Sequence, residues 1–288
     1  MTTRILTGTA GWSYPHWNGV VYPRPRPRGF HELEFLSQSF DTVEVNSTFY
    51  RPVRPEVARL WLQKVSQNRG FVFTAKLGRR FTHERVLDSR EVEEFKAGLK
   101  PLLDAGKLGC VLMQFPWSFR FTRENREFLI ALRRAFAPFP LAAEMRHSSW
   151  MLEEALGTLI DYHISFTNID QPQLEKAMPP AAHLTAPVAY VRLHGRHRHN
   201  WFQDFDGEAL VRKTSDYLYS PAELREWQAR IRGLAEHASQ VFVIFNNDGG
   251  GKAVVNALQM QSLLQASAHV RPHRRRSQAE LFPERAVA

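Results

Sequence analysis

The chain has 288 residues, of which 43% are hydrophobic and 23% are charged. This is the composition of a soluble globular protein with a large core, and it excludes a disordered or fibrous chain. No apolar run approaches the roughly 20 residues that span a bilayer, no signal-peptide core follows Met1, and the single cysteine, Cys110, excludes a disulfide framework. We therefore expect a cytoplasmic protein without membrane contact, whose net charge of +9 suits polyanionic partners.

Eight short apolar segments follow one another along the chain, and nearly every one ends in charged or amide residues. They are residues 4–11, 42–47, 71–76, 108–114, 141–146, 164–170, 189–194 and 241–247. Helical patterns lie between most of them, at residues 30–38, 55–68, 89–105, 123–136, 152–161, 221–237 and 251–266. This alternation predicts an α/β fold, a single (β/α)8 TIM-type barrel over residues 1–266, followed by a disordered basic C-terminal tail at 267–288.

Two connections depart from the pattern. Residues 171–187 hold at most a short helix, because Pro179 and Pro180 interrupt it. Residues 195–220 form a long loop rich in histidine, arginine and aromatic residues, and loops of this length inside a compact fold tend to bind ligands.

The polar strand ends are expected to converge, because a barrel carries its active site at the carboxyl ends of its strands. Residues two apart on a strand share a face, so each polar set is expected to point toward the barrel axis and each apolar set toward the helices. The candidate catalytic residues are Glu44, Glu144, His194 and Asp170. The candidate substrate-binding residues are Asn46, Tyr50, Lys76, Gln114, Arg146, Trp150, Arg192, Asn246, Asn247, Trp12 and Tyr14.

Acidic and basic residues balance at this mouth, which bears on the chemistry. Arginine and lysine would hold a phosphate or carboxylate, while His194 and one carboxylate would move a proton. A divalent metal held by Glu44, Glu144, Asp170 and His194 remains an alternative, although a metal site would normally lack so many compensating cations. We therefore expect no metal and no cofactor.

A short motif lies in the tail. Gln278, Leu281 and Phe282 are spaced as in the peptides with which bacterial replication and repair proteins dock onto the sliding clamp. A flexible end suits such a motif, so a sliding clamp is a candidate partner. The alternative is a terminus that packs Leu281 and Phe282 onto the barrel.

The segments taken together resemble one family. The motifs are GTAGWSY (residues 8–14), EVNSTFY (44–50), FTAK (73–76), QFP (114–116), EMRHSSW (144–150), RLHG (192–195) and FNN (245–247). In this order they resemble the domain-of-unknown-function 72 (YecE-like) family over residues 4–266. The resemblance implies a (β/α)8 barrel with these residues at its mouth, and it implies no particular reaction.

Three functional hypotheses follow. The first is an enzyme with hydrolase-like, metal-independent acid–base chemistry that binds or cleaves a phosphate-bearing substrate related to nucleic acid, DNA or RNA. The second is a metal-independent isomerase or lyase acting on a small sugar acid or sugar phosphate. The third is a non-catalytic adaptor that binds nucleic acid. Fold alone does not choose among them, because barrels host many chemistries.

Overall fold

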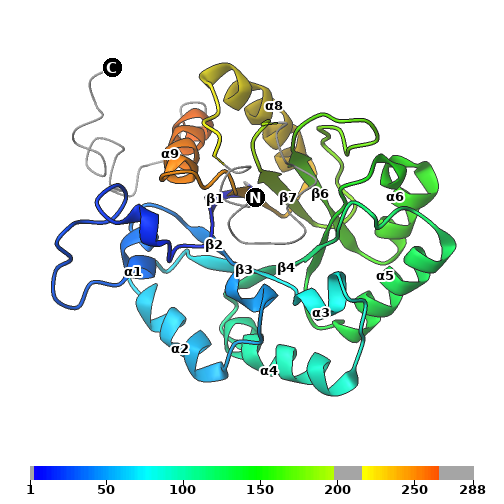
Figure 1. The fold of residues 1–288 in the computed structure, drawn as a ribbon, viewed down its shortest axis with the longest axis horizontal. Coiled ribbons are helices and arrows are strands. Elements are labelled where there is room, and N and C mark those ends of the chain that lie inside the picture. The colour runs from blue at the N-terminus through cyan, green and yellow to red at the C-terminus, as the bar shows by residue number, and fades with distance from the viewer. Residues whose placement is uncertain (1–2, 198–215, 266–288) are drawn as a thin grey trace.

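The computed structural model describes residues 3–197 and 216–265, which form a closed barrel of eight parallel strands (Figure 1). The strands pair in chain order, and β1 closes the barrel against β8. Their bounds are β1 Arg4–Ala10, β2 Thr42–Val45, β3 Val72–Lys76, β4 Leu108–Gln114, β5 Leu141–Glu144, β6 Ile164–Asp170, β7 Val188–Leu193 and β8 Gln240–Phe245. The predicted (β/α)8 barrel is confirmed.

Helices surround the strands, as the view down the barrel shows (Figure 1). They are α1 Glu32–Ser37, α2 Pro55–Lys64, α3 Arg79–Thr82, α4 Ser89–Asp104, α5 Arg123–Ala135, α6 Glu153–Asp161, α8 Pro221–His237 and α9 Lys252–Gln265. Three short 3-10 helices follow β1, β2 and β5: η1 Pro15–Trp17, η2 Ser47–Phe49 and η3 Ser148–Met151. The connection from β6 to β7 contains no helix, as its prolines suggest. No helix in the described ranges is long and apolar enough to cross a membrane.

The helix starts follow from their capping residues. Ser220 and Glu223 form a capping box at the start of α8. At α4 the cap is Asp88, because the Asp88 carboxylate accepts a hydrogen bond from the backbone N–H of Glu91.

Two apolar layers enclose the strands. The larger one lies between the strands and the helices, while a smaller cluster fills the barrel interior. The interior cluster consists of Leu6, Ala10, Val72, Cys110, Leu112, Ala142, Tyr190, Phe242 and Ile244. Cys110 is therefore a buried interior residue with a free thiol, as expected.

The expectation that every polar strand end faces the axis is wrong for β6 and for part of β8. On β6, Asn168 pairs in register with Val191 and Asp170 pairs with Leu193, both of which belong to the outer layer. In the extended segment that follows β8, Asn247 comes two residues after Phe245, whose side chain belongs to the outer layer, so Asn247 also points outward. The physical reason is the strict alternation of side chains along a strand, which puts these residues on the helix side.

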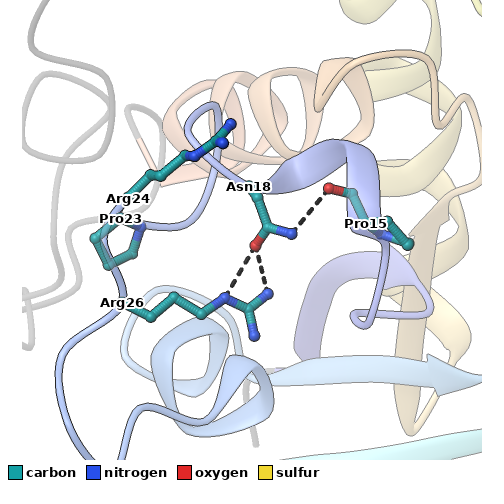
Figure 2. A pocket seen from close by; sticks show the side chains of 5 residues that line it. All are labelled: Pro15, Asn18, Pro23, Arg24 and Arg26. Atoms are coloured by element: carbon teal, nitrogen blue, oxygen red, sulfur yellow. Dashed lines mark hydrogen bonds between the residues drawn. The ribbon is translucent and has the colours of Figure 1, made fainter.

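The Pro/Arg-rich segment after η1 forms a shallow pocket of its own, lined by Pro15, Asn18, Pro23, Arg24 and Arg26 (Figure 2). The Arg26 guanidinium donates to Asn18 Oδ1 at 2.9 Å and forms an ion pair with Glu32 at 2.6 Å. Figure 2 shows Asn18 joined to both Arg26 and Pro15, so these contacts brace the segment.

Candidate active site at the barrel mouth

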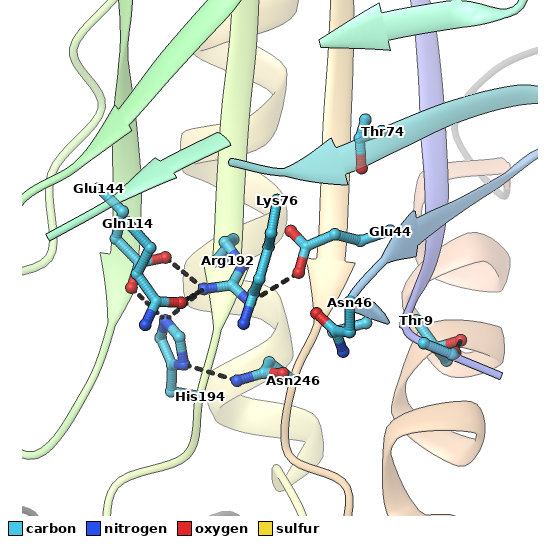
Figure 3. A network of polar contacts seen from close by, with 12 residues as sticks. Thr9, Glu44, Asn46, Thr74, Lys76, Gln114, Glu144, Arg192, His194 and Asn246 are labelled. Carbon is cyan, nitrogen blue, oxygen red and sulfur yellow. Dashed lines mark hydrogen bonds and ion pairs between the residues drawn. The ribbon is translucent and has the colours of Figure 1, made fainter. Parts of the chain in front are cut away.

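Arg192 of β7 is the centre of the polar layer at the carboxyl ends of the strands, and its side chain is fully buried (Figure 3). Its Nη2 donates to Glu44 Oε1 at 2.8 Å, and its Nη1 donates to Gln114 Oε1 at 3.0 Å and to Glu144 Oε2. One guanidinium thus joins side chains from β2, β4 and β5. Burial of two carboxylates is tolerated here because each is paired and hydrogen-bonded.

Tyr190 contacts this cluster from the barrel interior, one layer closer to the amino ends of the strands. It lies two residues before Arg192 on β7, so both side chains point into the barrel. Its buried hydroxyl donates to Glu44 Oε2 at 2.9 Å and lies 2.8 Å from Thr74 Oγ1. Both oxygens of Glu44 therefore have a partner, which fixes the carboxylate in place.

Glu144 lies among three nitrogen-bearing side chains. Its Oε1 is 2.6 Å from Arg146 Nη2 and 3.2 Å from His194 Nε2, while Arg192 contacts Oε2. Burial by itself would raise the pKa of this carboxyl, but the charges of Arg146 and Arg192 hold the pKa well below its usual value. Glu144 is therefore an anion at neutral pH.

His194 is neutral at neutral pH. Burial, and then the charge of Arg146, lowers its pKa to about 3. Its Nε2 faces the Glu144 carboxylate, and its Nδ1 is 3.0 Å from Asn246 Nδ2. These contacts fit a neutral ring with its proton on Nε2, which positions Glu144 rather than supplying a proton.

Lys76 and Arg146 are the charged side chains of the cluster that remain partly accessible to solvent. Arg146 has 14% of its side chain exposed and also donates to Gln171 Oε1 at 3.2 Å. Lys76 places its Nζ 5.7 Å from the centre of the Phe49 ring. Burial, and then the charge of Arg192, lowers the pKa of Lys76 to about 8.

Asn46 and Tyr14 lie together on the side of β1 and β2. The Asn46 amide donates to the Tyr14 hydroxyl at 3.1 Å, and that hydroxyl donates to the carbonyl of Ala10 at 2.6 Å. The Asn46 Oδ1 is buried and accepts no hydrogen bond from the residues that the structure describes. It is therefore an acceptor available to a ligand.

Asp170 belongs to a different cluster. Its carboxylate pairs with Arg196 at 2.9 Å, and Arg196 also contacts Glu223 and Glu226 of α8. Burial raises the pKa of Asp170 despite these contacts. The structure thus places the fourth candidate catalytic residue between the barrel and α8, on the opposite face of the strands from the Arg192 cluster.

Two further candidates, Asn247 and Trp150, also have structural contacts. Asn247 donates to the carbonyl of Tyr217 at 2.7 Å and to Asn256 of α9 at 2.8 Å. Trp150 is fully buried, stacks on Phe119 and donates to its carbonyl at 2.8 Å. Through these contacts the two side chains attach loops to the barrel, and they do not face its mouth.

The two remaining aromatic candidates differ in exposure. Trp12 packs edge-on against Trp61 with the ring centres 5.4 Å apart. Tyr50 has 69% of its surface exposed and contacts Phe49, the ring that also faces Lys76. Tyr50 is thus the candidate aromatic residue best placed to contact a ligand.

Two predictions from the sequence concern residues outside the described ranges. The tail with Gln278, Leu281 and Phe282 lies outside the described residues, as does most of the loop at 195–220. In the described ranges, no three His, Cys, Asp or Glu side chains are grouped in a way that could hold a metal ion.

Tyr190 and Thr74 belong to the cluster although neither is among the candidate site residues named from the sequence. Tyr190 could have been found from its spacing, because a residue two positions before the inward-facing Arg192 shares its face. Thr74 has the same relation to Lys76 on β3.

The fold and this cluster define a (β/α)8 barrel with a buried layer of charged and polar side chains at the carboxyl ends of its strands. Residues 6–280 match the family described as "Protein of unknown function DUF72", and the chain belongs to this family. It is 30% identical over 271 residues to the UPF0759 protein YunF of Bacillus subtilis, covering 90% of this chain and 94% of that one.

Solved structures agree with this assignment. A DUF72 family protein from Thermotoga maritima shares 33% identity at a TM-score of 0.77, covering 91% of this chain and 99% of that one. A DUF72 family protein from Enterococcus faecalis shares 25% identity at a TM-score of 0.79, covering 93% and 98%. The family resemblance seen in the sequence is therefore confirmed.

Proposed function

We propose that this protein is an enzyme that acts on a small anionic substrate, a sugar acid or a sugar phosphate, as an isomerase or lyase. The observation that carries the proposal is the position of two partly accessible cations, Lys76 and Arg146, beside two buried carboxylates that Arg192 also contacts. Three basic side chains, Arg192, Arg146 and protonated Lys76, thus face the carboxylates of Glu44 and Glu144, and this excess of one positive charge attracts an anion.

The carboxylates themselves are poorly placed to act as metal ligands or as a general acid. Both oxygens of Glu44 and both oxygens of Glu144 contact protein donors. Glu144 stays ionised because of its low pKa, and His194 stays neutral. Lys76 is the group of the cluster whose pKa of about 8 suits proton transfer near neutral pH.

Asn46 supports a hydroxylated substrate. Its buried Oδ1 has no donor among the described residues, so a substrate hydroxyl could donate to it. Arg146 would bind the phosphate or carboxylate of the same molecule, because a guanidinium forms paired bonds with such groups.

The test is calorimetric binding of ribose 5-phosphate and gluconate, with uncharged ribose as the matched ligand. We expect the anions to bind more tightly than ribose, and Arg146→Gln to weaken anion binding by roughly tenfold to a hundredfold, the effect of losing one charge-assisted hydrogen bond. Arg123→Gln is the control variant, because the Arg123 side chain is 91% exposed on α5. Anion binding that is equal in both variants would contradict the proposal.

A second titration tests the first hypothesis, that the site binds a nucleic acid. Short single- and double-stranded DNA are titrated against the same variants over a salt series. If DNA binds, and Arg146→Gln weakens that binding while the small anions do not bind, the mouth serves a nucleic acid instead.

A further inference from the structure

Lys76 differs from the other charged residues of the cluster in its contacts. Arg192, Arg146, Glu44 and Glu144 are all joined by ion pairs, whereas Lys76 forms none with the residues that the structure describes. The nearby carboxylates are engaged by the two arginines. The Lys76 amine instead faces the Phe49 ring.

The position of Lys76 in the barrel directs its amine toward the site. Lys76 ends β3 and pairs in register with Leu112, which belongs to the interior cluster. Figure 3 shows the Lys76 side chain of β3 extending toward the Arg192 guanidinium, which comes from β7 on the opposite side of the barrel. Burial of this amine and the positive charges of Arg192 and Arg146 favour its neutral, nucleophilic form, because each disfavours a further positive charge.

We propose that the Lys76 amine is a nucleophile that forms an imine with the carbonyl carbon of the anionic substrate, so that the substrate is a 2-oxo acid or a phosphorylated aldehyde or ketone. This inference rests on the proposed function, because it takes the same mouth as the substrate site. It adds the chemical class of the substrate and the bond that forms.

The chemistry balances with water as the only released product. The neutral Nζ attacks the carbonyl carbon, the C=O π bond breaks with its electron pair moving onto oxygen, and a proton passes from Nζ to that oxygen to give a carbinolamine. This intermediate then takes up a proton from solvent on the hydroxyl and loses water, which leaves a protonated imine. The positive imine nitrogen withdraws electrons from the adjacent carbon, and this stabilises the carbanion formed when a C–H or C–C bond there breaks.

The experiment traps the imine with cyanoborohydride in the full-length protein. Glyoxylate, the smallest aldehyde that carries a carboxylate, is the probe, and acetaldehyde is the matched uncharged aldehyde. Peptide mapping by mass spectrometry then reports the adduct at each lysine. Lys76→Arg keeps a charge but cannot form the imine, and Lys100→Arg is the control because Lys100 is 66% exposed on α4.

We expect glyoxylate to modify Lys76 roughly tenfold or more faster than Lys100 at pH 7, because a pKa of about 8 leaves far more free amine than the usual lysine value near 10.4. We also expect the adduct at Lys76 to form faster with glyoxylate than with acetaldehyde, and the adduct at Lys100 to form at similar rates with both. The Lys76→Arg variant should lose the fast adduct, while Lys100→Arg should keep it.

Two results would overturn the imine. One is labelling spread evenly over surface lysines, and the other is a fast adduct that persists in Lys76→Arg. If ribose 5-phosphate or gluconate still binds in an Arg146-dependent manner while Lys76 gives no adduct, the imine is wrong and the anion site stands. If Lys76 reacts fast but equally with both aldehydes and independently of Arg146, the nucleophile stands and the anion site is wrong.

Discussion

Arg192 is the residue on which the buried charges depend. Its guanidinium contacts Glu44 and Glu144 at once, and both carboxylates are fully buried. The pair contacts compensate for the loss of hydration that each charge suffers inside the barrel. Removing the shared partner is therefore more damaging than neutralising one carboxylate.

We expect Arg192→Met to lower the free energy of unfolding by about 3–5 kcal/mol, because it leaves two buried carboxylates without their guanidinium. Glu44→Gln should cost less, since the amide can still accept from the hydroxyl of Tyr190. Urea denaturation measures both, with Arg123→Met on the exposed face of α5 as the control. Equal losses in the two cluster variants would show that Arg192 does not hold the pair.

The amine of Lys76 should titrate near pH 8. Its pKa is lowered to about 8, so the neutral form predominates above that pH and the reaction with a small neutral acylating reagent should level off there. Ordinary exposed lysines, with a reference pKa near 10.4, keep gaining reactivity over the same range. Competitive labelling between pH 6 and 10, read by peptide mapping, measures this; a rate that still climbs steeply above pH 9 would contradict it.

At the scale of the elements, the sequence predicts the strands well because their polar ends interrupt clear apolar runs. It fails at β6, although the signal was present: Ile164 and Phe166 face the helices, and Asn168 and Asp170 continue that same face. The same alternation separates Asn246, which contacts His194, from Asn247. A polar residue at a strand end therefore need not face the barrel axis, because its face is set by the apolar residues two and four positions before it.

The partners of each charge were harder to predict. Glu144 and Arg146 lie two residues apart, so the sequence places them on one face of a strand, and their ion pair is present. Arg192, however, contacts both glutamates, because β7 and the β2–β5 side of the barrel face each other across the axis. Such contacts across a closed barrel depend on strand register and side-chain length, which a single sequence does not specify.

We expect Asp170 to stabilise the packing of α8 against the barrel, through Arg196, and to have no effect on substrate binding. Asp170→Asn removes the charge that Arg196 contacts, so we expect a loss of about 1–3 kcal/mol in the free energy of unfolding. Binding of gluconate or ribose 5-phosphate should stay within about twofold of the unchanged protein, since no charge of the Arg192 cluster is altered. Calorimetry on the folded variant measures this. Loss of binding without loss of stability would instead place Asp170 in the site.

For the whole molecule, the neutral state of His194 links the candidate site to stability in acid. Its pKa is about 3 in the folded protein and 6.5 in the unfolded chain, so between these values only the unfolded chain takes up the proton. Stability is thus fully present above pH 6.5 and falls as the pH decreases toward 3. At pH 5 this one group should cost about 2 kcal/mol relative to pH 8.

Comparison with His194→Gln isolates this contribution from the other titrating groups. The glutamine amide can still donate to Glu144, although it does not fill the space of the imidazole ring, so the variant should be less stable than the parent at pH 8. Because the glutamine cannot take up a proton, the variant should lose less of its stability on acidification. Urea denaturation at both pH values measures the two free energies of unfolding. We expect the difference between pH 8 and pH 5 to be about 2 kcal/mol smaller in the variant. If the two proteins lose equal stability, His194 is protonated in the folded state, and it would then add a positive charge to the mouth instead of a neutral donor.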